Sequence, residues 1–147
     1  MISKVETITD WDRIEQILEL FDKSFPRPLS ERVGSLKDYA KKLSESAVVD
    51  IVSLENNIAG FSAYYCNDSV SKQAFLTQIA VADACRGMNI GNILLNTCIE
   101  TSKQKGMEKL ICEVDNINVG AILFYKKRGF TFLKKASEDS QLLIKYL

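Results

Sequence analysis

The sequence contains no histidine in its 147 residues. A Ser-His-Asp or Cys-His nucleophile and the His-containing zinc sites all need that residue, so these classes of site are excluded. Acid–base chemistry must therefore come from Asp, Glu, Tyr, Cys, Lys or water, and we expect no metal. The four cysteines form no Cys-x-x-Cys pair. Their scattered positions are typical of small buried side chains in a reducing compartment.

Long apolar runs and an excess of charge of one sign are also missing. No run approaches the roughly 18 residues of a membrane-spanning helix, and 19 basic residues balance 19 acidic ones. This balance argues against a basic nucleic-acid-binding face and against a polybasic membrane anchor. The first residues lack the apolar stretch of a signal peptide. We therefore expect a cytoplasmic protein with no nucleic-acid or membrane partner.

The residues that are present predict a single α/β domain over residues 1–147. The length and the 46% hydrophobic content suffice for one core. Capping-box spacing at Thr9–Asp12 and at Ser35–Asp38 marks two helix starts, and Asn56-Asn57 predicts a hairpin turn. Further helices are expected after the loop at 86–92 and after Asn118. The predicted strands cover residues 2–8, 47–55, 58–66, 74–81, 107–115, 130–134 and 142–147.

The loop between the strand at 74–81 and the following helix carries the clearest chemical signal. It reads Arg86-Gly87-Met88-Asn89-Ile90-Gly91-Asn92. A helix N-terminus has unpaired amides and a partial positive charge, so such a loop suits a phosphate or pyrophosphate. The residues alone leave a plain glycine-containing helix start equally open. Neither the Gly-x-Gly-x-x-Gly dinucleotide fingerprint nor a Gly-Lys-Ser/Thr P-loop is present.

This loop resembles the acetyl-CoA loop of the GNAT (Gcn5-related) N-acetyltransferases, Arg/Gln-x-x-Gly-x-Gly/Ala. The segment 118–130 is similar to that family's Asn-x-x-Ala-x-x-Phe/Leu-Tyr…Gly-Phe signature, and the likeness is strongest over residues 75–132. The resemblance implies a GNAT-like fold: a mixed, mostly antiparallel sheet of six to seven strands, splayed at its centre and flanked by about four helices. One departure is Asn89, which stands at the family's middle glycine, although asparagine tolerates the left-handed conformation.

The resemblance also implies which residues bind acetyl-CoA. The pantetheine arm is expected in the splay, on main-chain groups near Ile79 and Val81, like an added strand. The pyrophosphate is expected on the loop amides, and Arg86 adds a charge-assisted contact. The implied cofactor-binding residues are Ile79, Ala80, Val81, Arg86, Gly87, Met88, Asn89, Ile90, Gly91, Asn92, Asn118 and Tyr125.

Two residues are candidates for catalysis. Tyr125 stands where the family protonates or stabilises the departing thiolate, whereas an aromatic residue on a helical stripe is ordinarily core. Glu113 is the first candidate for general base, on the strand beside the splay, although an exposed charge on an alternating strand needs no function. A water oriented by Gln78 is the alternative, and Asp83 and Asp115 are weaker candidates.

The expected activity is transfer of an acetyl group from acetyl-CoA to a primary amine of a small molecule, an amino sugar or an amino acid, by direct attack in a ternary complex. Arg27 and Arg32, in the loop after the first helix, are candidates to bind a carboxylate or phosphate of the acceptor. A protein or peptide N-acetyltransferase and a noncatalytic acyl-CoA-binding module stay open. The protein is expected to be a monomer or a homodimer.

Overall fold

Seven strands form one mixed sheet in the computed structural model, which describes residues 3–147. Along the sheet the order is β1-β2-β3-β4-β5-β7-β6, and β4 and β5 form the parallel pair in an otherwise antiparallel arrangement. The predicted mostly antiparallel sheet is confirmed, while residue 2 of its first predicted strand lies outside the described residues. The strands are β1 (Ser3–Ile8), β2 (Val48–Leu54), β3 (Asn57–Tyr65), β4 (Gln73–Val81), β5 (Lys109–Asp115), β6 (Thr131–Lys135) and β7 (Ser140–Tyr146).

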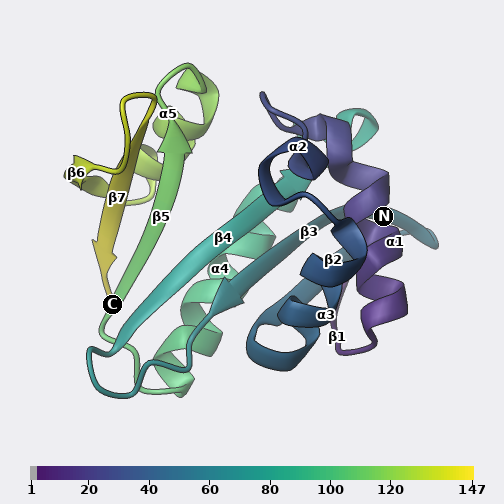
Figure 1. Cartoon of the computed structure of the whole chain (residues 1–147), viewed down its shortest axis with the longest axis horizontal. Helices are drawn as coiled ribbons and strands as arrows, with labels where there is room; N and C mark the ends of the chain where they lie inside the picture. The colour runs from purple at the N-terminus through teal and green to yellow at the C-terminus, as the bar shows by residue number, and fades with distance from the viewer. Residues whose placement is uncertain (1–2) are drawn as a thin grey trace.

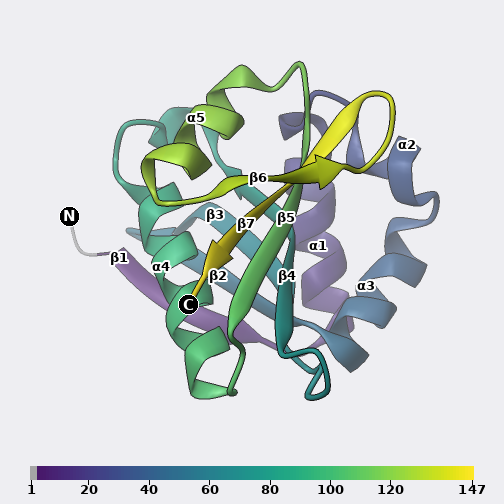
Figure 2. The same ribbon diagram turned by 90° about the vertical axis from the view of Figure 1, so that its left-hand side faces the viewer.

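Helices cover both faces of the sheet (Figures 1 and 2). On one face α1 and α3 pack against β1–β3, with residues of α1 buried at helical spacing. On the other face α4 and α5 share a core with β3, β4, β5 and β7. None of the helices within residues 3–147 is long and apolar enough to cross a membrane. The α-helices are α1 (Trp11–Phe21), α2 (Leu29–Val33), α3 (Leu36–Ser46), α4 (Ile90–Gln104) and α5 (Val119–Lys127).

The sheet opens between β4 and β5. These strands pair only where Gln73–Leu76 lie beside Lys109–Cys112, and beyond that point they diverge (Figure 1). The Ala82 amide donates to the Ala59 carbonyl at 2.8 Å. Because backbone groups of successive strand residues point to opposite edges, Ala80 also faces β3. The backbone groups of Ile79 and Val81 therefore face the gap, where β4 has a free edge.

Besides shifts of one or two residues at the ends of strands, three local features differ from the sequence prediction. The N-cap of α1 is Asp10, whose carboxylate accepts from the Asp12 amide, rather than Thr9. The hairpin between β2 and β3 places Glu55 and Asn56 at positive φ, one residue earlier than predicted. The unpredicted α2 lies in the loop after α1, where Asp22 accepts from the backbone amide and the hydroxyl of Ser30.

Candidate active site

The turn that leads from β4 into α4 contains two residues with positive φ, Gly87 and Asn89. Gly87 has φ 80°, and Asn89 has φ 67° and ψ 15°, so Asn89 adopts the left-handed conformation expected of it. The Met88 amide donates to the Cys85 carbonyl at 3.2 Å and is therefore already used by the turn. Within residues 3–147, the amides of five predicted loop residues donate to no backbone carbonyl: Gly87, Asn89, Ile90, Gly91 and Asn92. These amides form a concentrated set of free donors at the start of a fifteen-residue helix.

The start of α4 packs closely against α5. A Cβ added at Gly91 would lie 3.2 Å from Cε1 of Phe124. One turn further along α5, the Arg128 guanidinium lies 3.9 Å from the centroid of the Phe124 ring, and its Nε donates to Asn92 Oδ1 at 2.9 Å. This contact could not be predicted from the sequence. The basic run at residues 126–128 ends a helix, and nothing in it indicates that Arg128 folds back over the ring of Phe124.

Two cavities adjoin this region. The first, which we call the loop cavity, has a volume of about 550 Å³ and is lined by Val81, Arg86, Gly91, Phe124 and their neighbours. The second, the charged cavity, has a volume of about 610 Å³ and lies in the splay between β4 and β5. The residues that line both cavities are Phe25, Pro26, Ile79, Asn118, Ala121 and Tyr125.

Tyr125 lies on α5 at the junction of the two cavities. Its side chain is 4% exposed and belongs to the core shared by α4, α5 and β5. Burial, and after it the neighbouring Cys112, raises the pKa of Tyr125 well above its ordinary value. The phenol therefore stays protonated throughout the physiological range and keeps a proton to donate. Burial likewise raises the pKa of the Cys112 thiol to about 12, which leaves that cysteine unreactive.

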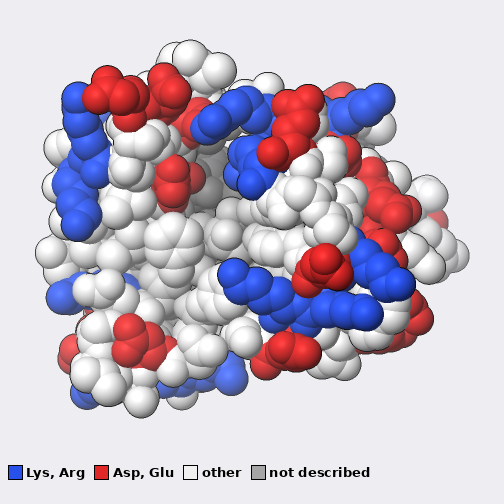
Figure 3. Space-filling view, in the orientation of Figure 1, with Lys and Arg blue, Asp and Glu red and all other residues white. Residues whose placement is uncertain are grey.

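The charged cavity is lined by Arg27, Glu31 and Arg32 on the side of α2 and by Glu113 and Asp115 on the side of β5. Figure 3 shows a hollow on this face with basic side chains on one side and acidic ones on the other. Arg27 Nη2 lies 2.6 Å from Asp115 Oδ1, so this ion pair links the loop after α1 to β5 across the splay. The hydrogen bond and the charge of Asp115 raise the pKa of Arg27, with smaller contributions from Asp139 and Glu113.

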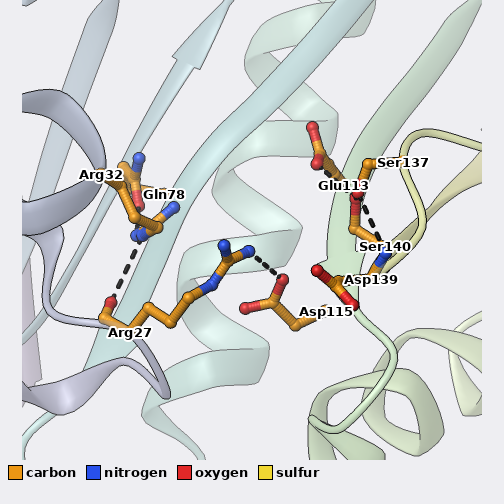
Figure 4. Close-up of polar contacts among 8 residues, drawn as sticks. All are labelled: Arg27, Arg32, Gln78, Glu113, Asp115, Ser137, Asp139 and Ser140. Atoms are coloured by element: carbon orange, nitrogen blue, oxygen red, sulfur yellow. Dashed lines mark hydrogen bonds and ion pairs between the residues drawn. The ribbon is translucent and has the colours of Figure 1, made fainter.

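Glu113 lies in the charged cavity, as its position on β5 predicted. Its Oε2 accepts from the Ser140 hydroxyl at 2.6 Å, and Ser140 is itself within 2.8 Å of the Ser137 hydroxyl (Figure 4). The other carboxylate oxygen has no hydrogen-bond donor among the described residues. The two serines belong to the β6–β7 hairpin, and nothing in their local sequence indicated this role.

Asp83, a weaker candidate for the general base, lies away from the charged cavity. It pairs with Arg86 and borders neither cavity.

The wall opposite β5 is built from an unpredicted polar network. Arg32 Nη2 donates to Gln78 Oε1 at 3.2 Å, and Gln78 Nε2 donates to the Tyr39 hydroxyl at 3.1 Å. Gln78 is 5% exposed, so its amide is fixed rather than free to rotate. Gln78, which the sequence offered as an alternative to orient a water, accepts a hydrogen bond from Arg32 in the structure.

The structure separates the predicted site residues into groups. Seven line the loop cavity: Ile79, Ala80, Val81, Arg86, Gly91, Asn118 and Tyr125. Glu113 lines the charged cavity, while Gly87, Met88, Asn89, Ile90 and Asn92 belong to the turn and first residues of α4 beside the loop cavity. Asn118 caps α5 by accepting from the Ala121 amide, as predicted. Within residues 3–147 no group of three or more Cys, Asp or Glu side chains is arranged to hold a metal ion.

Comparison with known proteins gives one family. The model of the acetyltransferase (GNAT) family matches residues 11–130. A streptothricin acetyltransferase from Streptomyces lavendulae is 29% identical over 89 residues, which are 60% of this chain and 47% of that protein. N-alpha-acetyltransferase 30 from Schizosaccharomyces pombe is 22% identical over 126 residues, 83% of this chain and 80% of that protein.

Solved structures share the whole fold. The PaiA N-acetyltransferase from Thermoplasma acidophilum, in complex with coenzyme A, superposes with a TM-score of 0.76 at 14% identity. The match covers 100% of both chains. The chain also spans about half the length of several curated relatives that it matches.

Proposed function

The chain belongs to the GNAT acetyltransferase family, whose acetyl donor is acetyl-CoA, and on that premise we propose that it acetylates the primary amine of a small molecule. The observation that carries this proposal is the meeting of two cavities at Tyr125, one beside the α4 turn and one in the splay. A ternary complex needs this arrangement, because donor and acceptor must both reach one reacting centre. We further propose that residues 1–147 form one acetyltransferase domain.

The loop cavity fits acetyl-CoA in two respects. Free amides at the start of α4, with Arg86 nearby, suit a pyrophosphate. The free edge of β4 at Ile79 and Val81 offers main-chain donors and acceptors to an amide-containing arm such as pantetheine. Asn89 supports the turn in the conformation that glycine would take, so its side chain does not prevent the loop from forming. Acetyl-CoA supplies the thioester whose carbon–sulfur bond breaks as the carbon–nitrogen bond forms.

Tyr125 acts on the departing sulfur. A thiol has a pKa of about 8.5, so the thiolate is a modest base that needs only a hydrogen bond or a proton. The raised pKa of Tyr125 makes full transfer of its proton to a thiolate of pKa about 8.5 unfavourable, but it keeps the hydroxyl protonated and able to donate a hydrogen bond to the sulfur. We assign Tyr125 as a hydrogen-bond donor that stabilises the departing thiolate.

The amine must lose a proton before or during attack. An alkylamine of pKa about 10.4 is neutral in roughly one molecule per thousand near pH 7. Glu113, with one oxygen held by Ser140 and the other without a donor, is positioned to bind the ammonium and to accept its proton. A water in the charged cavity is the alternative route for that proton.

Thermal unfolding followed by a turnover screen tests the proposal. At a ligand concentration about 100 times the dissociation constant, binding stabilises a protein by about 2.7 kcal/mol, which corresponds to roughly 5–11 °C here. We expect that shift with acetyl-CoA and desulfo-CoA but not with ATP, and release of free CoA on addition of small amines. Binding without turnover on small amines or N-terminal peptides would instead indicate a noncatalytic acyl-CoA-binding module. Turnover confined to peptides would identify a peptide acetyltransferase.

A further inference from the structure

The charged cavity contains one arginine whose charge is not neutralised. Five charged side chains line it: Arg27, Glu31, Arg32, Glu113 and Asp115. Arg27 and Asp115 neutralise each other in an ion pair of 2.6 Å. Among the described residues, Arg32 forms no ion pair with any carboxylate, although Glu31 is its neighbour on α2. A cation that lines a cavity without an anionic partner is available to bind an anion.

Arg32 is held in place by neutral groups only. Its Nη2 donates to Gln78 Oε1 at 3.2 Å, its Nε donates to the Arg27 carbonyl at 3.3 Å, and its guanidinium lies 5.1 Å from the centroid of the Phe25 ring. These contacts fix the plane of the guanidinium and leave Nη1 without an acceptor within residues 3–147. A planar guanidinium with free donors matches the two oxygens of a carboxylate.

The opposite wall presents the complementary charge. Glu113 forms no ion pair among the described residues, and Ser140 orients it from the β7 side. Figure 4 shows Arg32 and Gln78 on one side of the splay and Glu113, Ser137 and Ser140 on the other. The Arg27–Asp115 pair lies between the two groups. The facing walls of the cavity thus offer an unpaired cation, Arg32, and an unpaired anion, Glu113, while Glu31, which also forms no ion pair among the described residues, precedes Arg32 on α2.

We infer that the acceptor is an amino acid, a small molecule that carries a carboxylate together with the amine that is acetylated. This inference rests on the proposed acetyltransferase activity and deepens it. The ammonium binds Glu113 and gives it one proton, so that the neutral amine attacks the thioester. As the carbon–nitrogen bond forms and the carbon–sulfur bond breaks, the nitrogen loses a second proton, which the departing CoA thiolate takes up. The carboxylate binds Arg32 and is unchanged by the reaction. Arg32 is therefore a specificity-determining residue, and a neutral amino sugar lacks the group it recognises.

Matched pairs of acceptors test this assignment. The panel holds the common α-amino acids, the ω-amino acids from β-alanine to 5-aminopentanoate, the primary amide of each, 2-aminoethyl phosphate and glucosamine. We expect at least one acid to exceed its amide in kcat/KM by about 10- to 100-fold, the range for a charge-assisted hydrogen bond. The chain length of the preferred acid then reports the separation of the two subsites.

The Arg32→Gln variant connects that preference to the residue. We expect it to reduce the acid-to-amide ratio to about one, mainly through KM, while Arg32→Lys retains part of it. Arg13→Gln is the matched control, because Arg13 lies on α1 in an ion pair with Glu6 outside both cavities. Calorimetry of the preferred acid with the CoA-saturated protein provides a readout independent of turnover, and there Arg32→Gln should weaken binding by the same factor.

Four results would overturn the inference while leaving the proposed function intact. Two are equal turnover of acids and amides and an acid preference that survives Arg32→Gln. The other two are a preference for glucosamine and a preference for 2-aminoethyl phosphate over every carboxylate. Failure of the acetyltransferase proposal itself is distinct, since acetyl-CoA would then either not bind or release no CoA with any amine.

Discussion

At the scale of single residues, Tyr125 is buried, protonated and in contact with the place where two cavities meet. We predict that Tyr125→Phe lowers kcat by about 10- to 100-fold, toward the low end of general-acid effects, because the thiolate loses its donor. The dissociation constant of acetyl-CoA should change little, since the ring is retained. Stopped-flow measurement of CoA release, with chemistry limiting, gives kcat, and titration calorimetry gives affinity.

The comparison for that variant is Cys112→Ala, which removes the neighbouring thiol but leaves the hydroxyl in place. It should cost stability through the small cavity it creates and leave kcat close to that of the wild type. If Tyr125→Phe turned over at the wild-type rate, Tyr125 would be a core residue only.

Asn89 shows how far a single residue could be predicted from sequence. The left-handed tolerance of asparagine predicted that the loop survives without the family's middle glycine, and the φ of 67° confirms it. We predict that Asn89→Ala destabilises the fold by about 1–2 kcal/mol, the cost of the left-handed conformation for an L-residue with no compensating side chain. Asn89→Gly should stay within about 0.5 kcal/mol, because relief of strain offsets the added entropy of the unfolded chain.

Urea unfolding of both variants measures these differences, and acetyl-CoA affinity checks the turn itself. Equal stability of the alanine and glycine variants would mean that residue 89 does not hold the left-handed conformation in solution.

At the scale of elements, the sequence predicted every strand and the four longer helices, most of them because they have apolar residues at the period of their own structure. The helix α2 was missed because only five residues form it and Pro28 precedes it. The cap of α1 was placed one residue early because Thr9 and Asp10 are both good N-cap residues. Local pattern could not decide between them.

The packing of α4 on α5 could not be predicted from the sequence either. Because of this packing, Gly91 leaves room for the Phe124 ring as well as a free backbone amide. A methyl group there would lie 3.2 Å from Phe124, so the ring must move by a few tenths of an ångström. Phe124 lines the loop cavity. We predict that Gly91→Ala weakens acetyl-CoA binding by about tenfold, about 1.4 kcal/mol. Stability should change little, because alanine is the better helix former.

A second substitution distinguishes two causes of that weaker binding: displacement of the Phe124 ring and obstruction of the backbone amides near Gly91. Phe124→Leu in the Gly91→Ala background shortens the side chain that the new methyl meets, so calorimetry should show part of the affinity restored. If no affinity were restored, the effect of Gly91→Ala would lie at the free amides at the start of α4 rather than at the Phe124 ring.

At the scale of the whole molecule, two parts of the sheet meet only along the short paired stretch of β4 and β5. The resemblance to the GNAT family implied the splay, and with it the place of the site. Arg27, Arg32 and Glu113 were candidates from the sequence, but their contacts in the charged cavity and the part played by Ser140 could not be predicted, because these residues come from segments far apart in sequence. Their contacts depend on how the loop after α1 and the β6–β7 hairpin approach each other across the gap.

The Arg27–Asp115 ion pair spans that gap, and its contribution to stability can be bounded. The side chain of Arg27 is 52% exposed and that of Asp115 is 17% exposed. Exposed ion pairs contribute about 0.2–1 kcal/mol, and screening weakens them at high salt, where the Debye length is about 3 Å at 1 M. A double-mutant cycle with Arg27→Gln and Asp115→Asn, measured by urea unfolding, should therefore give a coupling of at most about 1 kcal/mol that decreases at 1 M salt. The shared core of α4 and α5 with both parts of the sheet then holds the splay open without the pair. A coupling of several kcal/mol that salt leaves unchanged would show instead that the pair is a structural clamp, and that the charged cavity collapses or widens when it is broken.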